Sequence, residues 1–116
     1  MKRGFRLTRS TDIKRVRRSG KSYAHPLVVL YVLKSDVPET HVAVSAGLAV
    51  GNAIKRNRAK RLLRAAMSDL MENIIPGSDL LLIARSPLPA SNFEHAREAL
   101  SILLKRAGLL SKTHDL

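Results

Sequence analysis

Residues 52–68 have the pattern of an amphipathic helix, because charged and apolar side chains recur on opposite sides at helical spacing. At about 100° per residue, one side carries Asn57, Lys60, Arg61, Arg64 and Ser68. The opposite side carries Ala59, Leu63, Ala66 and Leu70. The segment holds six cations and no acidic residue. We therefore predict a helix that packs by its apolar side and presents a row of positive charge on the other.

The positive charge of the chain is concentrated in two segments. Of the 21 lysines and arginines, nine lie in residues 1–21 and six in residues 55–64, and the net charge is +12. Scattered charge would be enough for solubility, whereas a row of cations repels itself unless an anion lies along it. The phosphate backbone of a nucleic acid suits such a row best, so the charge pattern predicts a nucleic-acid partner.

Length and composition limit the class of protein. The 116 residues fit one domain, 1–116, and the apolar share of 45% is enough for a modest core. The absence of cysteine excludes disulfides, thiolate catalysis and cysteine zinc sites, and favours the cytoplasm. The longest apolar run, residues 27–33, is too short to cross a bilayer, so no membrane contact is expected. We expect residues 1–9 and 110–116 to be loosely ordered.

The order of predicted elements is helix, two or three strands, helix, strand, helix. The predicted ranges are a helix from Ser10 or Thr11 to Gly20, extended structure over 22–34 broken at Pro26, a strand over 41–46, a helix from the N-cap Asn52 to about Ile75, a strand over 79–84, and a helix from Ser91 to Gly108. In the last helix, Ser91 and Glu94 match a capping box, and Phe93 is expected in the core.

These elements predict an α+β protein, a small sandwich of a mostly antiparallel sheet with three helices. The short segment 35–40 favours an antiparallel hairpin between the strands at 27–33 and 41–46. The long helix between two strands indicates a β-α-β crossover.

The sequence does not predict a catalytic or metal site made of protein side chains. Acid–base or metal chemistry needs carboxylates, histidines or thiols that converge. The nine acidic residues are spread along the chain, and Glu94 and His95 are adjacent instead of being at ligand spacing. Gly47 and Gly51 are not followed by the residues of a phosphate-binding loop, so nucleotide triphosphate binding is not expected.

The basic helix is the main candidate binding site. Arginine remains ionised and can hold two phosphate oxygens through its planar fork, and Asn57 can donate to and accept from a base or ribose. A helix that is merely solvated would carry glutamates between its cations, and this one has none through residue 68. Tyr31 has two readings: it could stack a nucleobase if it faces out of the sheet, or line the core.

Residues 51–64, Gly-Asn-Ala-Ile-Lys-Arg-Asn-Arg-Ala-Lys-Arg-Leu-Leu-Arg, closely resemble the signature of the bacterial ribonuclease P protein component. The characteristic part is the triplet at 56–58 followed by Lys60, Arg61 and Arg64. Further landmarks follow in family order. They are Leu7, the surroundings of Asp12, Gly20, the run 29–31 and the run 83–87.

The resemblance implies a function and partners. A protein of this family is the protein subunit of an endoribonuclease whose catalytic RNA, with bound Mg²⁺, removes the 5′ leader from precursor tRNA. It implies a left-handed β-α-β crossover, no cofactor bound by the protein alone, and no required protein partner. The residues that match the helix contacting the RNA subunit are Asn52, Lys55, Arg56, Asn57, Arg58, Lys60, Arg61 and Arg64. Those that match the cleft for the leader are Ile13, Arg17 and Tyr31.

This chain departs from the family pattern in two places. Family members commonly carry aromatic residues at the positions of Ile13 and Arg17, and often two lysines where this chain has Leu48 and Ala49. An RNA-binding protein of the ribosome would share the size and charge and is the competing hypothesis. A helix-turn-helix DNA-binding protein fits poorly, because strands precede and follow the basic helix.

Overall fold

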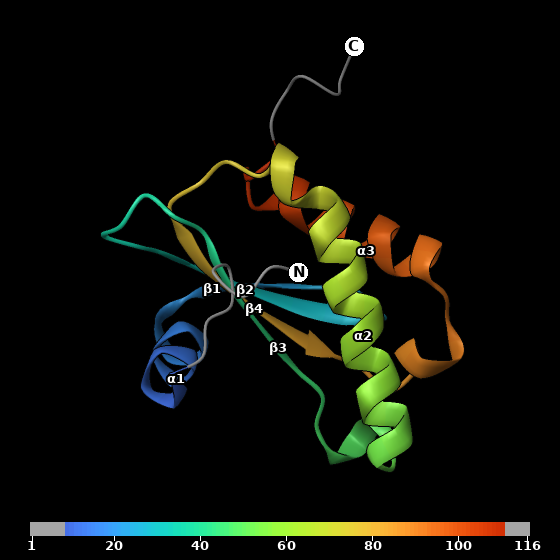
Figure 1. Ribbon diagram of the computed structural model, residues 1–116. Coiled ribbons are helices and arrows are strands. Elements are labelled where there is room, and N and C mark those ends of the chain that lie inside the picture. The colour runs from blue at the N-terminus through green and yellow to red at the C-terminus, as the bar shows by residue number, and fades with distance from the viewer. Residues whose placement is uncertain (1–8, 111–116) are drawn as a thin grey trace.

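The computed structural model describes residues 9–110, which form a four-stranded sheet with helices on both faces (Figure 1). The main elements in chain order are α1 (Ser10–Ser19), β1 (Lys21–Ala24), β2 (Val28–Lys34), β3 (His41–Ser45), α2 (Ala53–Leu70), β4 (Ser78–Ala84) and α3 (Phe93–Arg106). Short 3₁₀ turns lie at Leu48–Val50, Met71–Asn73 and Leu88–Ala90. The predicted α+β class with three helices is confirmed.

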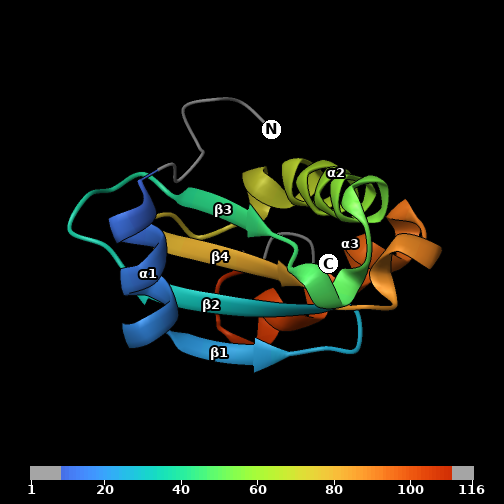
Figure 2. The ribbon, with the colours of Figure 1, turned by 90° about the horizontal axis from the view of Figure 1, so that it is seen from below.

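The strands lie in the order β1-β2-β4-β3 (Figure 2). The pairs β1–β2 and β2–β4 are antiparallel, and β3–β4 is parallel, so the sheet is mostly antiparallel as predicted. The chain runs from β3 through α2 to β4, which confirms a β-α-β crossover. The left-handed sense of the crossover stays a prediction.

The predicted hairpin between residues 27–33 and 41–46 is wrong, because β4 lies between these two strands. Strand β4 is buried along almost its whole length, on both faces of the sheet. Such an apolar strand loses most contact with water when it has a strand neighbour on each side and helices above and below. Strand β4 therefore lies next to β2, in the place that the short loop 35–40 led us to expect for β3. The hairpin that does form joins β1 and β2.

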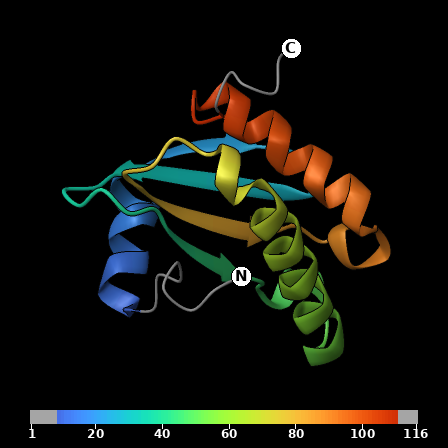
Figure 3. The same cartoon turned by 45° about the horizontal axis from the view of Figure 1, so that its top comes forward.

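The two faces of the sheet are covered unequally. On one face, α2 and α3 lie side by side and bury the main core against β2, β3 and β4 (Figure 3). On the other face, α1 contributes Val16, which packs on Ala43 and Leu81, with Ile13 and Tyr31 half-buried beside them. Figure 2 shows α1 across one end of the strands, with no helix of residues 9–110 over the remainder of that face. Part of the sheet is thus left accessible beside α1.

The ends of α1 and α2 agree with the sequence only in part. Asn52 caps α2 as predicted, and its Oδ1 accepts a hydrogen bond of 3.0 Å from the Lys55 amide. The helix ends at Leu70, before the predicted limit near Ile75, because a 3₁₀ turn at Met71–Asn73 bends the chain toward β4. Neither Ser10 nor Thr11 caps α1, since Arg9 occupies the N-cap position without a side-chain hydrogen bond.

The start of α3 corrects two predictions. The cap is Asn92, whose Oδ1 accepts from the His95 amide at 2.8 Å, and Ser91 with Glu94 does not form the capping box. Phe93 is therefore the first residue of the helix and is 39% exposed, whereas the buried stripe begins one turn later at Ala96. The prediction that Phe93 lies in the core is wrong for that reason.

Most of the terminal residues predicted to be loosely ordered, 1–8 and 111–116, lie outside the described residues. The two described members of those segments are held by backbone contacts. The Arg9 carbonyl accepts from the Ile13 amide at 3.1 Å, and Leu110 forms a β-bridge with Ile74.

Candidate nucleic-acid interface

Helix α2 packs by its apolar side and leaves its cations at the surface. Ala59, Leu63, Ala66 and Met67 are fully buried against the sheet and α3. Of the predicted RNA-binding residues, Asn52, Lys55, Asn57, Arg58 and Arg61 are exposed, and Arg56, Lys60 and Arg64 are half-buried. Within residues 9–110, none of the six cations forms an ion pair with an acidic side chain. The basic surface of α2, defined by these eight residues, thus carries charge that no acidic side chain in the described part of the chain pairs with.

Two of the predicted RNA-binding arginines also hold the protein together. Arg58 Nε donates to the Pro89 carbonyl at 2.7 Å, and its Nη2 donates to the Ser91 carbonyl at 3.3 Å. Arg56 Nη1 donates to the Gly51 carbonyl at 3.3 Å. A guanidinium has five N–H donors, so both side chains keep donors for another ligand. Sequence reasoning missed these contacts, because no local pattern brings residues 89–91 beside α2.

A buried carboxylate fixes α1 on the opposite face of the sheet. Asp79 is the second residue of the buried strand β4 and is 4% exposed. Its Oδ2 accepts a hydrogen bond of 3.0 Å from Arg15 Nη2, and its Oδ1 lies 3.5 Å from His41 Nδ1. A buried charge is costly unless it is paired, which gives α1 one preferred position on the sheet. In the sequence, Asp79 stands out as an acidic residue directly before an apolar run. The sequence does not show that Arg15 and His41 are its partners.

The predicted leader residues lie on α1 and on the sheet face beside it. Ile13 and Tyr31 are half-buried around the cluster of Val16, Ala43 and Leu81, so both have a packing role as well as partial access to solvent. Arg17 is one helical turn from Ile13 and is exposed. Tyr31 therefore lies outside the main core, on the part of the sheet that only α1 approaches.

The structure does not bring the two predicted sets of residues together. The basic surface belongs to α2, which covers one face of the sheet, whereas Ile13, Arg17 and Tyr31 lie on the other face. Figure 1 shows α1 and α2 on opposite sides of the strands. The two predicted sets of residues thus form two separate surfaces.

The first turn of α2 carries an apolar surface that sequence reasoning missed. Leu48, in the 3₁₀ turn before the helix, is 83% exposed, and Ile54 is 77% exposed. These two large apolar side chains flank the N-cap Asn52 in the sequence, and Ile54 directly precedes the cation Lys55. The turn that precedes α2 is therefore uncharged at Leu48 and Ala49, whereas all six cations of the helix lie between Lys55 and Arg64.

Residues 9–110 contain no group of three or more histidine and acidic side chains placed to hold a metal ion. No helix in the same range is long and apolar enough to cross a membrane.

Comparison with known proteins agrees with the arrangement of α2 and the sheet. The model of the family described as Ribonuclease P matches residues 1–108. The chain belongs to the ribonuclease P protein family. A ribonuclease P protein component of Exiguobacterium is 37% identical over 112 residues, which cover 97% of each chain. That of Oceanobacillus iheyensis is 34% identical over 116 residues, which cover 99% of this chain and 96% of the relative.

Solved structures of ribonuclease P proteins have the same fold. The protein of Staphylococcus aureus superposes with a TM-score of 0.81 at 25% identity, covering 92% of this chain and 98% of that one. The protein of Thermotoga maritima gives 0.77 at 28% identity, covering 87% of this chain and 96% of that one. The three helices and mixed sheet described above are therefore those of the ribonuclease P protein family.

Proposed function

We propose that this protein is the protein subunit of ribonuclease P, which binds the catalytic RNA and the 5′ leader of precursor tRNA and promotes 5′ maturation of tRNA. The observation that carries the proposal is the basic surface of α2, which contains the family signature and whose cations have no acidic partner in residues 9–110. Bond cleavage belongs to the RNA and its Mg²⁺, and the protein contributes binding and positioning.

In this proposal, the basic surface of α2 binds the RNA subunit. Its cations replace the metal ions that condense on the RNA backbone, and release of those ions favours assembly. The apolar side of α2 is packed on the sheet and α3, so the helix that carries the cations is fixed before the RNA arrives. Asn57, exposed among them, supplies a donor and an acceptor for a base or a ribose.

The leader would bind on the sheet face beside α1. Tyr31 offers a partly accessible ring, and Arg17 offers a cation one helical turn from Ile13. Aromatic side chains on a sheet stack with single-stranded bases, and arginine binds phosphate. Because Ile13 and Arg17 are not aromatic, we expect the leader to be held here more by phosphate contact and less by stacking than in relatives with aromatic residues.

The separation of the two surfaces supports simultaneous binding. The RNA subunit on α2 and the leader beside α1 would lie on different faces of one sheet, so neither ligand competes with the other. The protein would then neutralise phosphate repulsion between two RNA molecules that must approach closely. The proposal needs no further protein partner, and it places the protein in the cytoplasm, with which the absence of cysteine is consistent.

Reconstitution tests the proposal directly. The protein is added to ribonuclease P RNA and precursor tRNA at a Mg²⁺ concentration too low for the RNA alone to cleave. We expect leader removal to be restored, and to be lost again when Lys60, Arg61 and Arg64 are replaced together by glutamine. Tight binding to ribosomal RNA fragments without any stimulation of leader cleavage would contradict the proposal and favour a ribosomal role.

A further inference from the structure

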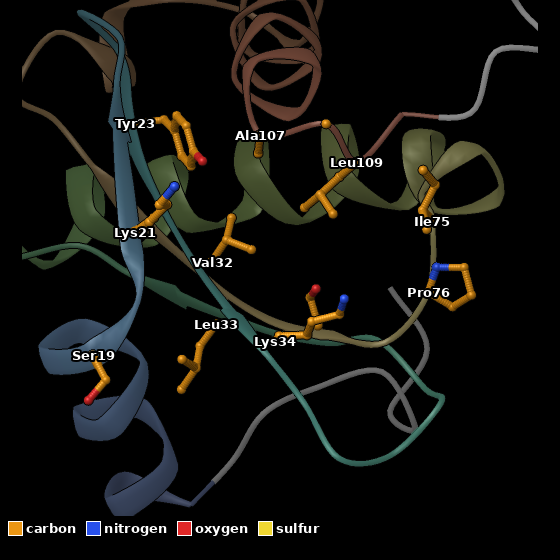
Figure 4. Close-up of a pocket in the computed structure, with 12 residues that line it drawn as sticks. Ser19, Lys21, Tyr23, Val32, Leu33, Lys34, Ile75, Pro76, Ala107 and Leu109 are labelled. Atoms are coloured by element: carbon orange, nitrogen blue, oxygen red, sulfur yellow. The ribbon is translucent and has the colours of Figure 1, made fainter.

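A cavity of about 510 Å³ opens at the end of the sheet near the C-terminus of α3 (Figure 4). Its walls come from β1, β2, the end of α3 and the segment that enters β4. The lining residues that matter here are Lys21, Tyr23, Val32, Lys34, Ile75 and Leu109. The cavity includes no residue of the basic surface of α2 and none of Ile13, Arg17 and Tyr31, so it is separate from both proposed RNA surfaces.

The strand side of the cavity is cationic. Lys21 pairs with Val32 in the β1–β2 register, and Lys34 follows Val32 by two residues, so all three side chains share one face of the sheet. Figure 4 shows both lysines on the same side of the strands as Tyr23 and Val32. No acidic residue lines the cavity, and neither lysine forms an ion pair within the described chain. Two ammonium groups in one cavity without a counter-charge favour an anion.

The middle of the cavity is apolar and contains an aromatic ring. Tyr23 is half-buried and presents its ring and hydroxyl beside Val32. Leu109 and the half-exposed Ile75 close the opposite wall. A ring and aliphatic side chains around a space of this volume suit a flat, partly apolar group such as a nucleobase. A bare inorganic anion would leave these surfaces uncovered.

The helix side of the cavity offers acceptors. Ala107 and Gly108 line it, and their carbonyl oxygens accept no hydrogen bond from the residues that the structure describes. The C-terminus of a helix also carries partial negative charge, which repels an anion and attracts N–H donors. A ligand with a phosphate at one end and N–H groups at the other matches both sides of the cavity. A fatty acid matches only the lysines and the apolar wall, and the side chains of an acidic peptide offer no flat ring to lie against Tyr23.

We propose that this cavity binds one nucleoside monophosphate unit, either as a free nucleotide or within single-stranded RNA. The phosphate lies between Lys21 and Lys34, and the base lies against Tyr23 with its N–H groups toward the end of α3. The inference does not rest on the ribonuclease P assignment, because it uses only the chemistry of this cavity. The reconstitution assay and the test below can therefore fail independently.

The test uses the full chain and NMR titration of its backbone amides with adenosine 5′-monophosphate. We expect saturable shifts at Tyr23, Val32 and residues 107–109, with little change in α2. Adenosine without phosphate and inorganic phosphate alone should each bind at least about tenfold more weakly. Titration with a short oligoadenylate, followed at Tyr23, Val32 and residues 107–109 only, identifies the source: tighter binding there than the mononucleotide indicates RNA, and weaker binding indicates a free nucleotide.

Matched variants separate the site from general attraction of anions. Lys21→Gln and Lys34→Gln should each weaken binding of adenosine 5′-monophosphate by about fivefold to tenfold. Lys105→Gln removes an exposed cation near the end of α3 that does not line the cavity, and should change the affinity less than about twofold. Tyr23→Leu keeps an apolar side chain, and should weaken the nucleotide while leaving inorganic phosphate unchanged.

Several results would overturn the proposal. These are the absence of saturable shifts at the cavity, equal affinity for inorganic phosphate and the nucleotide, and equal weakening by Lys105→Gln and Lys21→Gln. Binding of an acidic peptide as tightly as the nucleotide would also overturn it. Thermal unfolding of each variant checks that the fold is retained, and the spectrum of Tyr23→Leu away from the cavity provides a second check.

Discussion

The Arg15 guanidinium donates a hydrogen bond of 3.0 Å to the buried carboxylate of Asp79, and so joins α1 to the central strand β4. The other oxygen of Asp79 faces His41 of β3 at 3.5 Å. Val16 is the one fully buried side chain that α1 contributes, so the helix has a small apolar contact with the sheet. The position of α1, and with it the surface beside Tyr31, therefore depends strongly on this ion pair.

Replacing Arg15 with methionine should lower the free energy of unfolding by about 1–3 kcal/mol, because it leaves a buried carboxylate with His41 as its remaining partner. The exposure of Arg15 places the effect in the lower part of that range. Urea denaturation measures it. Arg18→Met is the matched control, since Arg18 is exposed on the same helix. Equal loss of stability in both variants would show that the ion pair does not fix α1.

Gly20 is required where α1 meets the sheet. Its backbone φ is −78°, so the constraint is space: a Cβ atom there would lie 2.6 Å from the Val16 carbonyl oxygen and 2.8 Å from that of Val32. Gly20→Ala should therefore cost about 1–3 kcal/mol of stability, because two backbone segments would have to move apart. Gly47→Ala is the control, since a Cβ there meets nothing within 4 Å. Thermal unfolding that leaves Gly20→Ala as stable as Gly47→Ala would refute this account.

Arg58 and Arg61 should separate stability from RNA binding. Arg58 donates to the Pro89 and Ser91 carbonyls, whereas the exposed Arg61 side chain forms no hydrogen bond or ion pair within residues 9–110. Arg58→Ala should lower stability by about 1–2 kcal/mol, and Arg61→Ala should leave it unchanged within about 0.5 kcal/mol.

Both variants should bind ribonuclease P RNA more weakly, which filter binding at fixed salt measures. If Arg61→Ala bound the RNA as tightly as the unchanged protein, the basic surface of α2 would not be the RNA contact. If Arg58→Ala were fully stable, its two backbone contacts would contribute nothing to the fold.

Salt dependence should report how many phosphates the protein neutralises. If about six are involved, the logarithm of RNA affinity should fall with the logarithm of salt concentration at a slope of roughly −4 to −5. Leu48→Lys places a cation in the uncharged turn that precedes α2, and should tighten binding and steepen the slope by up to about 0.9. Val37→Lys makes the same change at an exposed loop position away from α2 and should have little effect. A flat salt response, or equal effects of the two variants, would argue against binding by α2.

Local patterns were sufficient to predict α2 and its row of surface cations. The spacing of cations and apolar residues depends only on helix geometry, so the buried row from Ala59 to Leu70 and the exposed cations could be predicted without coordinates. The Asn52 cap was also predictable, because its hydrogen bond reaches only three residues along the chain. The signature at 56–58 identified the family for the same reason, since it is written in consecutive residues.

Contacts between distant segments could not be predicted in this way. The place of β4 between β2 and β3 follows from competition among all the strands for the buried centre of the sheet, and loop length alone favoured the wrong neighbour. The exposure of Phe93 likewise followed from a one-residue shift in the helix start.

By itself, the sequence determined the amphipathic helix, its charge, the α+β class and the family, because each depends on neighbouring residues and on composition. Only the tertiary structure decided that Asp79 pairs with Arg15, that Arg58 binds the segment before α3, and that the two proposed RNA surfaces lie on opposite faces. The physical reason is that burial and pairing of charges are properties of the whole packed chain, in which each contact depends on where every other strand and helix has settled.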